Sequence, residues 1–389
     1  MIIGFDASRA FIKEKTGTEN YSYQLLKALA RIDRKNTYQV YLRPGVNFVK
    51  KDFPDNFQFS TLNFKFLWTQ GGLALQTFKD NIDVLFVPAH TLPVIRKPGL
   101  KTLVTVHDLG SEYLPAMHQL KQRLYLNFMT RSQLKSATAL IAVSRATKDD
   151  LIKRVGIKPD KISVSYEGYD KEKFKDTQSI KKYNLKYHSY FLFVGTVQPR
   201  KNLERLIIAF SKFISEEKLI YEQDLRFKNT DLRIKNHKSL IINHKSLKLV
   251  IAGSKGWLSD EIYQLPKKLG IEDRVKFLGY VPDKDLSALY FGAIALLFPS
   301  LFEGFGLPIL EAQACGCPVI TSNLSSMPEV AGKGAVYVNP YSVDDIVKGM
   351  IRIKNQELRI KLIKAGLDNI ERFSWEKCAK ETLGVLENL

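Results

Sequence analysis

The sequence has few cysteines and no long apolar run. Its three cysteines, Cys315, Cys317 and Cys378, are too few for a disulfide framework, which suits a reducing compartment. Cys315 and Cys317 flank a turn without the further ligands of a zinc site. No apolar stretch reaches the ~18 residues that span a bilayer, and Met1 leads directly into a strand-like run rather than a signal peptide. These absences predict a cytoplasmic protein.

Several binding motifs are also missing. The stretch from Gly253 to Gly256 lacks the spacing and the terminal Lys-Ser/Thr of a Walker phosphate loop. No Asp-x-Asp pair lies in a suitable loop, and His237 and His244 come from a local duplication that we interpret as exposed and inert. No nucleic-acid module and no basic face with stacking aromatics is legible, so nucleic acid is not an expected partner.

Acidic residues are scarce relative to basic ones. Lys and Arg number 59 against 40 Asp and Glu, a formal net charge of +19. Such an excess favours a polyanionic neighbour, either anionic lipid, nucleic acid or phosphorylated substrates. The alternative is that solvated faces simply carry lysine, because the lysines are spread along the whole chain. A basic first domain would hold the protein peripherally at an anionic inner leaflet of the cytoplasmic membrane, with ~1 kcal/mol per well-placed Lys or Arg.

What is present is an alternation of short apolar runs with amphipathic segments. At 389 residues the chain predicts two domains, and the alternation predicts a parallel sheet with helices on both faces in each. The fold class is therefore α/β, with two Rossmann-like, doubly wound domains. The predicted strands are 2–5, 38–42, 84–87, 102–106, 139–143, 190–194, 248–252, 275–278, 295–298 and 318–321, and the helices include 19–32, 121–133, 146–154 and 203–213.

Two irregular stretches divide this pattern. A lysine-rich segment, 169–188, is interpreted as a linker, so that residues 1–175 form an N-terminal domain and 186–368 a C-terminal one. Residues 215–248 are polar and basic and repeat Asn-His-Lys-Ser-Leu twice, which predicts an exposed insertion rather than a third domain.

The most informative stretch runs from Phe298 to Pro318 and is predicted to be strand, Gly-containing loop, helix, turn and strand. Pro308 suits a helix start, where backbone N–H groups beside Gly304 and Gly306 make a diphosphate cradle. Glu303 and Glu311 are expected to face one crevice at the carboxyl end of a strand, where parallel sheets bind ligands. The structural alternative for Glu311 is complementation of the helix dipole, worth ~0.3–1 kcal/mol.

A second loop follows the strand that ends at Val194. It contains Arg200 and Lys201 next to Asn202, a predicted N-cap of the following helix. Two cations beside a helix N-terminus favour an anionic ligand. An ordinary solvated loop is the alternative.

In this context the spacing from Glu303 to Glu311 resembles the signature of retaining glycosyltransferases of family 4, which have the two-domain GT-B fold. The resemblance implies that Glu303 contacts the transferred sugar, that Glu311 contacts the ribose hydroxyls, and that amides from Phe305 through Gly306 to Leu307 reach the diphosphate or sugar. It also implies that Arg200 and Lys201, within Pro-Arg-Lys-Asn, grip the diphosphate as it leaves. Gln198 stands where many relatives carry Glu.

The resemblance extends to other segments. Gly17 lies in a stretch similar to the glycine loop of the family, with one glycine where many relatives have two. His107, in a His-Asp pair after a strand, corresponds to the segment that reaches the donor sugar, in a positioning role and not as general base. Tyr280 lies in the turn that lies against the nucleotide base in relatives. Residues 369–389 correspond to a C-terminal helix that crosses back onto the first domain.

The implied function is transfer of a hexose, mannose in the first instance, from a GDP- or UDP-sugar to a saccharide or lipid-linked saccharide in cell-surface polysaccharide synthesis. Neither a cofactor nor a metal is expected. The expected partners are the nucleotide-sugar donor, the saccharide acceptor and an anionic membrane face. A sugar-nucleotide epimerase of the same fold and a non-catalytic, membrane-associated assembly protein remain alternatives.

Overall fold

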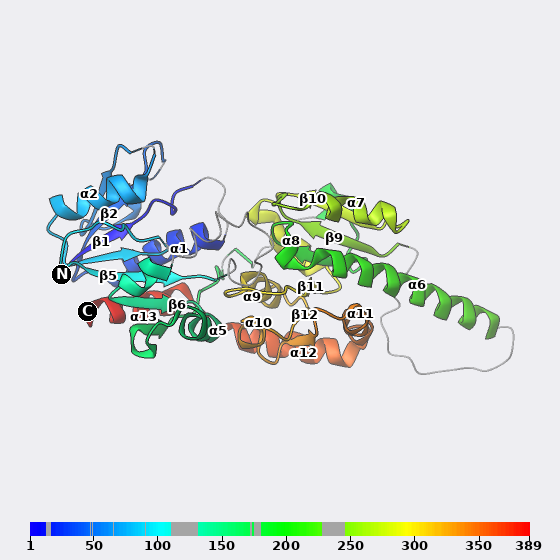
Figure 1. Cartoon of the computed structure of the whole chain (residues 1–389). Helices are drawn as coiled ribbons and strands as arrows, with labels where there is room; N and C mark the ends of the chain where they lie inside the picture. The colour runs from blue at the N-terminus through cyan, green and yellow to red at the C-terminus, as the bar shows by residue number, and fades with distance from the viewer. Residues whose placement is uncertain are drawn as a thin grey trace. The chain divides into compact units, whose positions relative to one another are not determined.

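The computed structural model describes residues 1–12, 17–46, 48, 50–64, 66–89, 91–109, 131–171, 173–174, 180–227 and 246–389. The chain divides into two compact units (Figure 1). The first unit comprises Met1–Tyr169 together with Phe373–Leu389, and the second comprises Asp170–Arg372. The division falls inside the stretch interpreted as a linker. The predicted helix 121–133 and the duplicated His237 and His244 lie wholly or mainly outside the described residues.

The first unit contains a parallel sheet whose described strands have the order β3-β2-β1-β4-β5-β6-β7. Its strands and helices are as follows: β1 Ile2–Asp6, α1 Gly17–Ile32, β2 Thr37–Leu42, η1 Lys50–Asp52, β3 Phe57–Thr61, η2 Trp68–Leu73, α2 Ala74–Lys79, β4 Val84–Val87, β5 Lys101–Val106, β6 Ala139–Ala142, α5 Arg145–Asp150, η4 Leu151–Val155, η5 Pro159–Lys161, β7 Ile162–Val164 and α13 Trp375–Glu387.

The second unit contains a parallel sheet of order β10-β9-β8-β11-β12-β13 within its described part. Its elements are as follows: η6 Ile180–Tyr183, β8 Tyr190–Val194, η7 Pro199–Lys201, α6 Leu203–Phe227, β9 Lys248–Ala252, α7 Asp260–Lys268, β10 Val275–Gly279, α8 Asp283–Gly292, β11 Leu296–Phe298, α9 Leu307–Ala314, β12 Val319–Ser322, α10 Met327–Ala331, β13 Ala335–Val338, α11 Val343–Arg352 and α12 Gln356–Ile370.

The apolar composition of the strands explains why both sheets are buried between helices. Every residue of β4, β11 and β12 is buried, as expected of parallel strands covered on both faces. On α1 the stripe of Leu25, Leu26 and Leu29 is fully buried, so the predicted helical periodicity holds. The α/β class and the paired doubly wound architecture are confirmed. The strands β3, β7 and β13 were not predicted. β3 is only partly buried and β7 has three residues, whereas the apolar run Ala-Val-Tyr-Val of β13 was missed.

One predicted boundary is wrong. The insertion was expected to begin at Ser215, but α6 continues without a break to Phe227. Polar residues there belong to the helix: Glu217 is nearly buried and accepts a hydrogen bond from Lys354 Nζ at 2.6 Å. α6 also packs against α11. The rest of the predicted insertion, up to residue 245, lies outside the described residues.

Among the described residues, no helix combines the length and the apolar character needed to cross a membrane. In the same part of the chain, no three side chains of His, Cys, Asp or Glu gather as metal ligands.

Candidate active site

The carboxyl edge of the second sheet is built from tightly packed backbone. β8 and β9 are followed by Gly195 and Gly253, and the amide of Gly253 donates to Gly279 O at the end of β10 at 2.8 Å. A Cβ at Gly253 would lie 1.9 Å from Gly195 O, so only glycine fits there. The close approach brings the loops after three parallel strands together at one edge, where α/β sheets bind ligands.

Two cations and one carboxylate meet at this edge. Arg200 and Lys201 lie on η7, directly after β8, and Glu303 lies in the loop after the neighbouring strand β11. Lys201 Nζ is 2.5 Å from Glu303 Oε1, and Arg200 Nη1 is 2.8 Å from Glu303 Oε2. The amide of Leu301 also donates to Arg200 O at 2.9 Å, which ties the two loops together. We call these three side chains the Glu303 cluster.

Burial and charge oppose each other at Glu303, which is 6% exposed. Burial alone would raise the pKa of the carboxyl group, but the charges of Lys201 and Arg200 outweigh burial and hold that pKa below its usual value. The carboxylate is therefore ionised at neutral pH. Arg200 and Lys201 place two cations at the edge where parallel sheets bind ligands, which suits a phosphate ligand.

The loop after Glu303 is held in shape by a serine. Ser326 Oγ donates to the carbonyl oxygens of Glu303 at 2.9 Å and Phe305 at 2.7 Å. Gly306 caps α9 with a φ of 112°, a conformation that side chains disfavour, and α9 begins at Leu307, one residue before the predicted start at Pro308. The Phe305 side chain is buried, so the loop presents backbone rather than this ring.

Glu311 has a different set of partners from Glu303. It accepts a hydrogen bond from the Tyr290 hydroxyl at 2.8 Å, and Tyr290 belongs to α8. Burial raises the pKa of Glu311, and the charge of Lys173 opposes that shift. The structure gives the two glutamates different hydrogen-bond partners, and their sharing of one crevice stays a prediction.

Asn202 precedes α6 as predicted, and its carbonyl oxygen accepts from the Leu206 amide at 3.1 Å. Its side chain does not cap the helix as the prediction implied. The amide group instead donates to Pro299 O at 3.0 Å and Pro340 O at 2.7 Å. Asn202 thus connects the Arg200–Lys201 loop to the loops after β11 and β13.

In the first unit, His107 follows β5 and is nearly buried. Its Nδ1 lies 3.2 Å from Glu167 Oε1, and its Nε2 lies 2.9 Å from Pro88 O. A carbonyl oxygen only accepts, so Nε2 carries hydrogen. Burial lowers the pKa of His107, but the hydrogen bond and charge of Glu167 outweigh burial, so the pKa is raised overall. The structure therefore binds the ring to the protein at both nitrogens.

Two further predicted residues lie at accessible positions. Gly17 is the first residue of α1, and a Cβ placed there would meet no atom of the described residues within 4 Å. Thr16, in the same predicted glycine loop, lies outside the described residues. Tyr280 follows β10 and is 52% exposed, so its ring is open to a ligand.

Sequence reasoning missed the residues that hold these side chains. Glu167, Tyr290 and Ser326 were assigned no role, although each makes a hydrogen bond described above. The only sequence signal for these three residues was the Tyr-Glu-Gly segment that contains Glu167. A carboxylate that is buried in such a segment requires a polar partner, which here is His107. Tyr290 is an ordinary apolar position in the helical pattern of α8, and nothing in the sequence marks it.

Two family models match this chain. "Glycosyltransferase Family 4" matches residues 15–173, and "Glycosyl transferases group 1" matches residues 215–368. The first match includes Gly17 and His107, and the second includes Glu303 and Glu311. The chain belongs to glycosyltransferase family 4.

Named relatives of this glycosyltransferase act in O-antigen synthesis. It is 29% identical to O-antigen chain mannosyltransferase B of Escherichia coli over 295 residues, covering 74% of this chain and 71% of the relative. It is 32% identical to O-antigen chain mannosyltransferase RfbU of Salmonella typhimurium over 268 residues, covering 69% of this chain and 63% of the relative. The match thus spans less than two thirds of RfbU.

Solved structures share the two-domain GT-B fold with this glycosyltransferase. Sucrose-phosphate synthase of Thermosynechococcus elongatus has a TM-score of 0.74 at 18% identity, covering 100% of this chain and 98% of the other. WaaG, a glycosyltransferase of lipopolysaccharide biosynthesis, has a TM-score of 0.68 at 17% identity, covering 98% and 99%. Anabaena HepE, solved with UDP and glucose, has a TM-score of 0.69 at 16% identity, covering 100% of both chains.

Proposed function

We propose that this glycosyltransferase transfers a hexose, with mannose as the first candidate, from a nucleoside-diphosphate sugar to a saccharide or lipid-linked saccharide, with retention of anomeric configuration. The observation that carries the proposal is the Glu303 cluster, with two cations against one carboxylate at the carboxyl edge of the second sheet. A donor diphosphate would accept charge-assisted hydrogen bonds from both cations.

The donor is expected to extend along the loops of this edge. Arg200, Lys201 and the backbone around Gly306 at the start of α9 would bind the diphosphate. Glu303 would accept hydrogen bonds from the transferred sugar. Glu311 would accept from the ribose hydroxyls, with the Tyr290 hydroxyl already on its other side.

The remaining contacts are assigned by position. Tyr280, half-exposed after β10, would lie against the nucleotide base. A phosphate or sugar would lie next to Gly17 at the start of α1, where a Cβ would meet none of the described residues. His107 is assigned a positioning role next to the donor sugar and not that of a general base, because both ring nitrogens already face hydrogen-bond partners within the protein.

The proposed reaction exchanges one bond at the anomeric carbon. The acceptor hydroxyl oxygen forms the new glycosidic bond on the face from which the phosphate departs, and the bond to the diphosphate breaks. The proton of the acceptor hydroxyl passes to the leaving phosphate oxygen, so the products are a glycoside and a nucleoside diphosphate. Lys201 and Arg200 stabilise the negative charge that develops on the leaving group. No metal is assigned, because these cations would provide that stabilisation.

Two observations bear on the donor. The named mannosyltransferase relatives support mannose. Both GDP- and UDP-sugars are tested as donors, since those names give the sugar without the base and HepE was solved with UDP. The same relatives support an acceptor in O-antigen-type polysaccharide synthesis.

A thermal-shift series tests donor binding. The purified protein is heated with GDP, UDP, ADP and their common sugar conjugates, and one nucleotide is expected to raise the melting temperature. A ligand at 100 times its Kd stabilises a folded protein by about 2.7 kcal/mol. If no nucleotide shifts the transition at millimolar concentration, the transferase proposal for this chain fails.

Lys201→Ala tests the role of the cluster. Loss of one preorganised charge donor is expected to lower turnover about 10²–10³-fold, measured as nucleoside diphosphate released with the donor found above. Lys212→Ala is the matched control, because Lys212 is an exposed lysine of the second unit that pairs with Asp344 at 2.7 Å. Turnover of Lys201→Ala equal to that of the control would remove Lys201 from the mechanism. The anomeric configuration of the product, measured by NMR, tests retention separately.

A further inference from the structure

Exposed apolar side chains gather in one region of the first unit. Isolated exposed apolar residues are ordinary, but a group of them marks an interaction surface. Phe66, Leu67 and Ile95 are 86%, 76% and 70% exposed. The group further includes Phe64, Leu75, Phe78 and Val94.

Hydrogen bonds hold the segments that carry these side chains next to each other. Gln70 of η2 donates to Leu92 O at 2.9 Å and accepts from the Val94 amide at 2.8 Å. Further along, the Lys97 amide donates to Thr77 Oγ1 of α2 at 3.0 Å. The loop 92–97 therefore runs along η2 and α2. We call the exposed side chains of Phe66, Leu67, Val94 and Ile95 the apolar surface.

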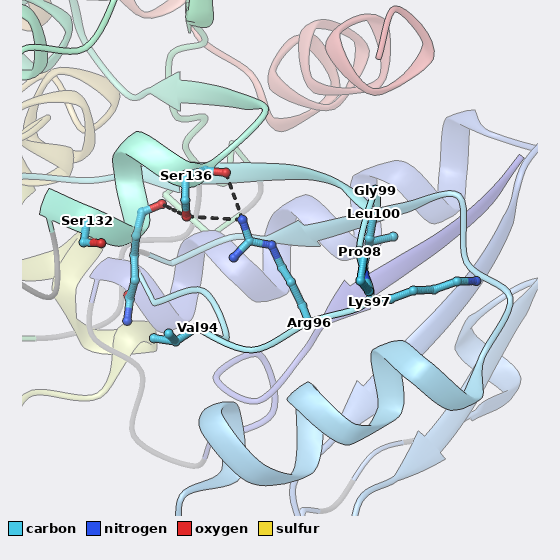
Figure 2. A pocket seen from close by; sticks show the side chains of 9 residues that line it. Val94, Arg96, Lys97, Pro98, Gly99, Leu100, Ser132 and Ser136 are labelled. Atoms are coloured by element: carbon cyan, nitrogen blue, oxygen red, sulfur yellow. Dashed lines mark hydrogen bonds between the residues drawn. The ribbon is translucent and has the colours of Figure 1, made fainter.

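A cationic pocket adjoins the apolar surface and shares Val94 with it. The pocket has a volume of about 390 Å³ and lies between the loop from Val94 to Leu100 and the residues Ser132 to Ser136. Figure 2 shows the Arg96 guanidinium reaching Ser136 across it. Lys97 also lines the pocket.

The Arg96 guanidinium donates its hydrogen bonds to uncharged groups. Its Nη1 donates to Pro93 O at 3.0 Å, and its Nη2 donates to Ser136 O at 2.9 Å and to Ser136 Oγ at 3.2 Å. Among the described residues no carboxylate pairs with it. A fixed, partly buried guanidinium without a counter-ion favours a phosphate ligand.

We propose that the apolar surface and the Arg96 pocket dock this glycosyltransferase on an anionic phospholipid bilayer. Phe66, Leu67 and Ile95 enter the interfacial layer, and Arg96 binds the phosphate of one headgroup. Charge complementarity selects this occupant over a neutral protein partner, because Arg96 and Lys97 line the pocket and the chain carries a net charge of +19. The inference concerns membrane recruitment and does not depend on which donor sugar is used.

The test is cosedimentation of the full chain with vesicles. Vesicles of phosphatidylcholine with about a third phosphatidylglycerol are compared with phosphatidylcholine alone, at low and high salt. The wild type is expected to bind the anionic vesicles, with binding that weakens as salt screens the charges. Absence of binding to anionic vesicles, or equal binding to both kinds, overturns the proposal.

Variants separate the two parts of the surface. Replacing Phe66, Leu67 and Ile95 together by Ser is expected to lower vesicle affinity at least tenfold, and Arg96→Gln to lower it on anionic vesicles alone. The control is Ile360→Ser on α12 of the second unit, which replaces an apolar side chain of similar exposure, 61%, and should bind like the wild type. Wild-type affinity of the triple variant overturns the proposal.

A fluorescent single variant tests the same surface in case the triple variant does not fold. In Phe66→Trp, the emission of the added indole is taken as the difference from the wild-type spectrum. This emission is expected to shift to shorter wavelength on addition of anionic vesicles and to be quenched by brominated lipid. An unchanged spectrum means that the residue stays in water and contradicts the proposal. Loss of a dimer in the triple variant, without any vesicle binding by the wild type, would instead make the surface a contact between two copies of this chain.

Discussion

At Glu303, two cations decide the charge state of a buried carboxyl group. Desolvation favours the neutral acid, and Lys201 at 2.5 Å and Arg200 at 2.8 Å reverse that preference. The same cations are the groups expected to meet the donor diphosphate. When the donor binds, the phosphate therefore competes with Glu303 for Lys201 and Arg200, and the carboxylate is expected to turn toward the sugar hydroxyls.

The lowered pKa of Glu303 predicts a pH dependence of stability. A carboxyl group whose pKa is lower in the folded than in the unfolded protein stabilises the fold above its unfolded pKa, near 4.5, and this contribution is lost as pH falls through the folded pKa. Glu303→Gln is expected to lower the free energy of unfolding at pH 7 by about 3–5 kcal/mol, because the buried Lys201 then loses its ion pair with Glu303.

Urea unfolding at several pH values measures this effect. The difference between wild type and Glu303→Gln should shrink as the pH falls below 4.5. Glu376→Gln is the control, because Glu376 is exposed and pairs with Lys380 one turn along α13. It should leave stability nearly unchanged. If the difference in unfolding free energy between the two proteins stays constant with pH, Lys201 and Arg200 do not lower the pKa of Glu303.

His107 offers a second residue-level prediction. Burial lowers the pKa of His107, but Glu167 raises it by more, so the pKa in the folded protein lies above its usual value. The stabilisation from this pair is therefore full below pH 6.5 and is lost as the pH rises through the folded pKa. Glu167→Gln is expected to lower the His107 pKa, measured by NMR titration of the imidazole carbons. The variant should also lose more stability at pH 6 than at pH 9.

The His107 resonance is assigned with His107→Asn, since the chain has six histidines. An unchanged titration curve in Glu167→Gln would mean that Glu167 does not set the charge of the ring.

Among the elements, α13 depends on a glycine outside it. Gly168, after β7, packs directly against the start of this helix, where a Cβ would lie 2.1 Å from Trp375 N. Ser374 caps the helix there by accepting from the Lys377 amide at 3.1 Å. α13 itself packs against α1 of the same unit. The contact between Gly168 and Trp375 thus fixes how the last segment of the chain joins the first unit.

Gly168→Ala is expected to destabilise the protein by about 1–3 kcal/mol, because backbone atoms rather than flexible side-chain ends meet the new methyl group. Thermal unfolding and limited proteolysis of the C-terminal segment measure the change. Gly384→Ala is the matched control on α13 itself, where a Cβ meets nothing within 4 Å. It should be neutral or stabilising, since alanine favours helix by about 1 kcal/mol over glycine. Equal behaviour of the two variants would contradict the packing argument.

The element boundaries show where local patterns fail. Apolar runs predicted the buried strands well, but the polar composition after Ser215 was interpreted as the start of an insertion. α6 continues there because contacts from elsewhere in the chain support it, including Lys354 with Glu217 at 2.6 Å. A helix supported by distant partners needs no strong local signal.

At the scale of the whole molecule, nucleotide binding is expected to protect one edge of the second sheet. Hydrogen exchange with the donor nucleotide should slow at residues 195–202, 253–256, 280–281 and 303–307, which follow β8, β9, β10 and β11. The exchange of the first unit's strand β2, Thr37–Leu42, serves as the internal reference. Protection spread evenly over both units, or absent from this edge, would place the nucleotide elsewhere.

The sequence by itself determined the α/β class, the two doubly wound sheets and the family, because apolar periodicity and short loop motifs are local properties. It also singled out Arg200, Lys201, Glu303 and Glu311 as candidate ligands of the donor. Only the tertiary structure decided that the first three form one ion cluster while Glu311 pairs with Tyr290, and that Glu167 holds His107. The reason is physical: these contacts join side chains from strands and helices far apart in the chain, and their distances and burial exist only once the sheets have formed.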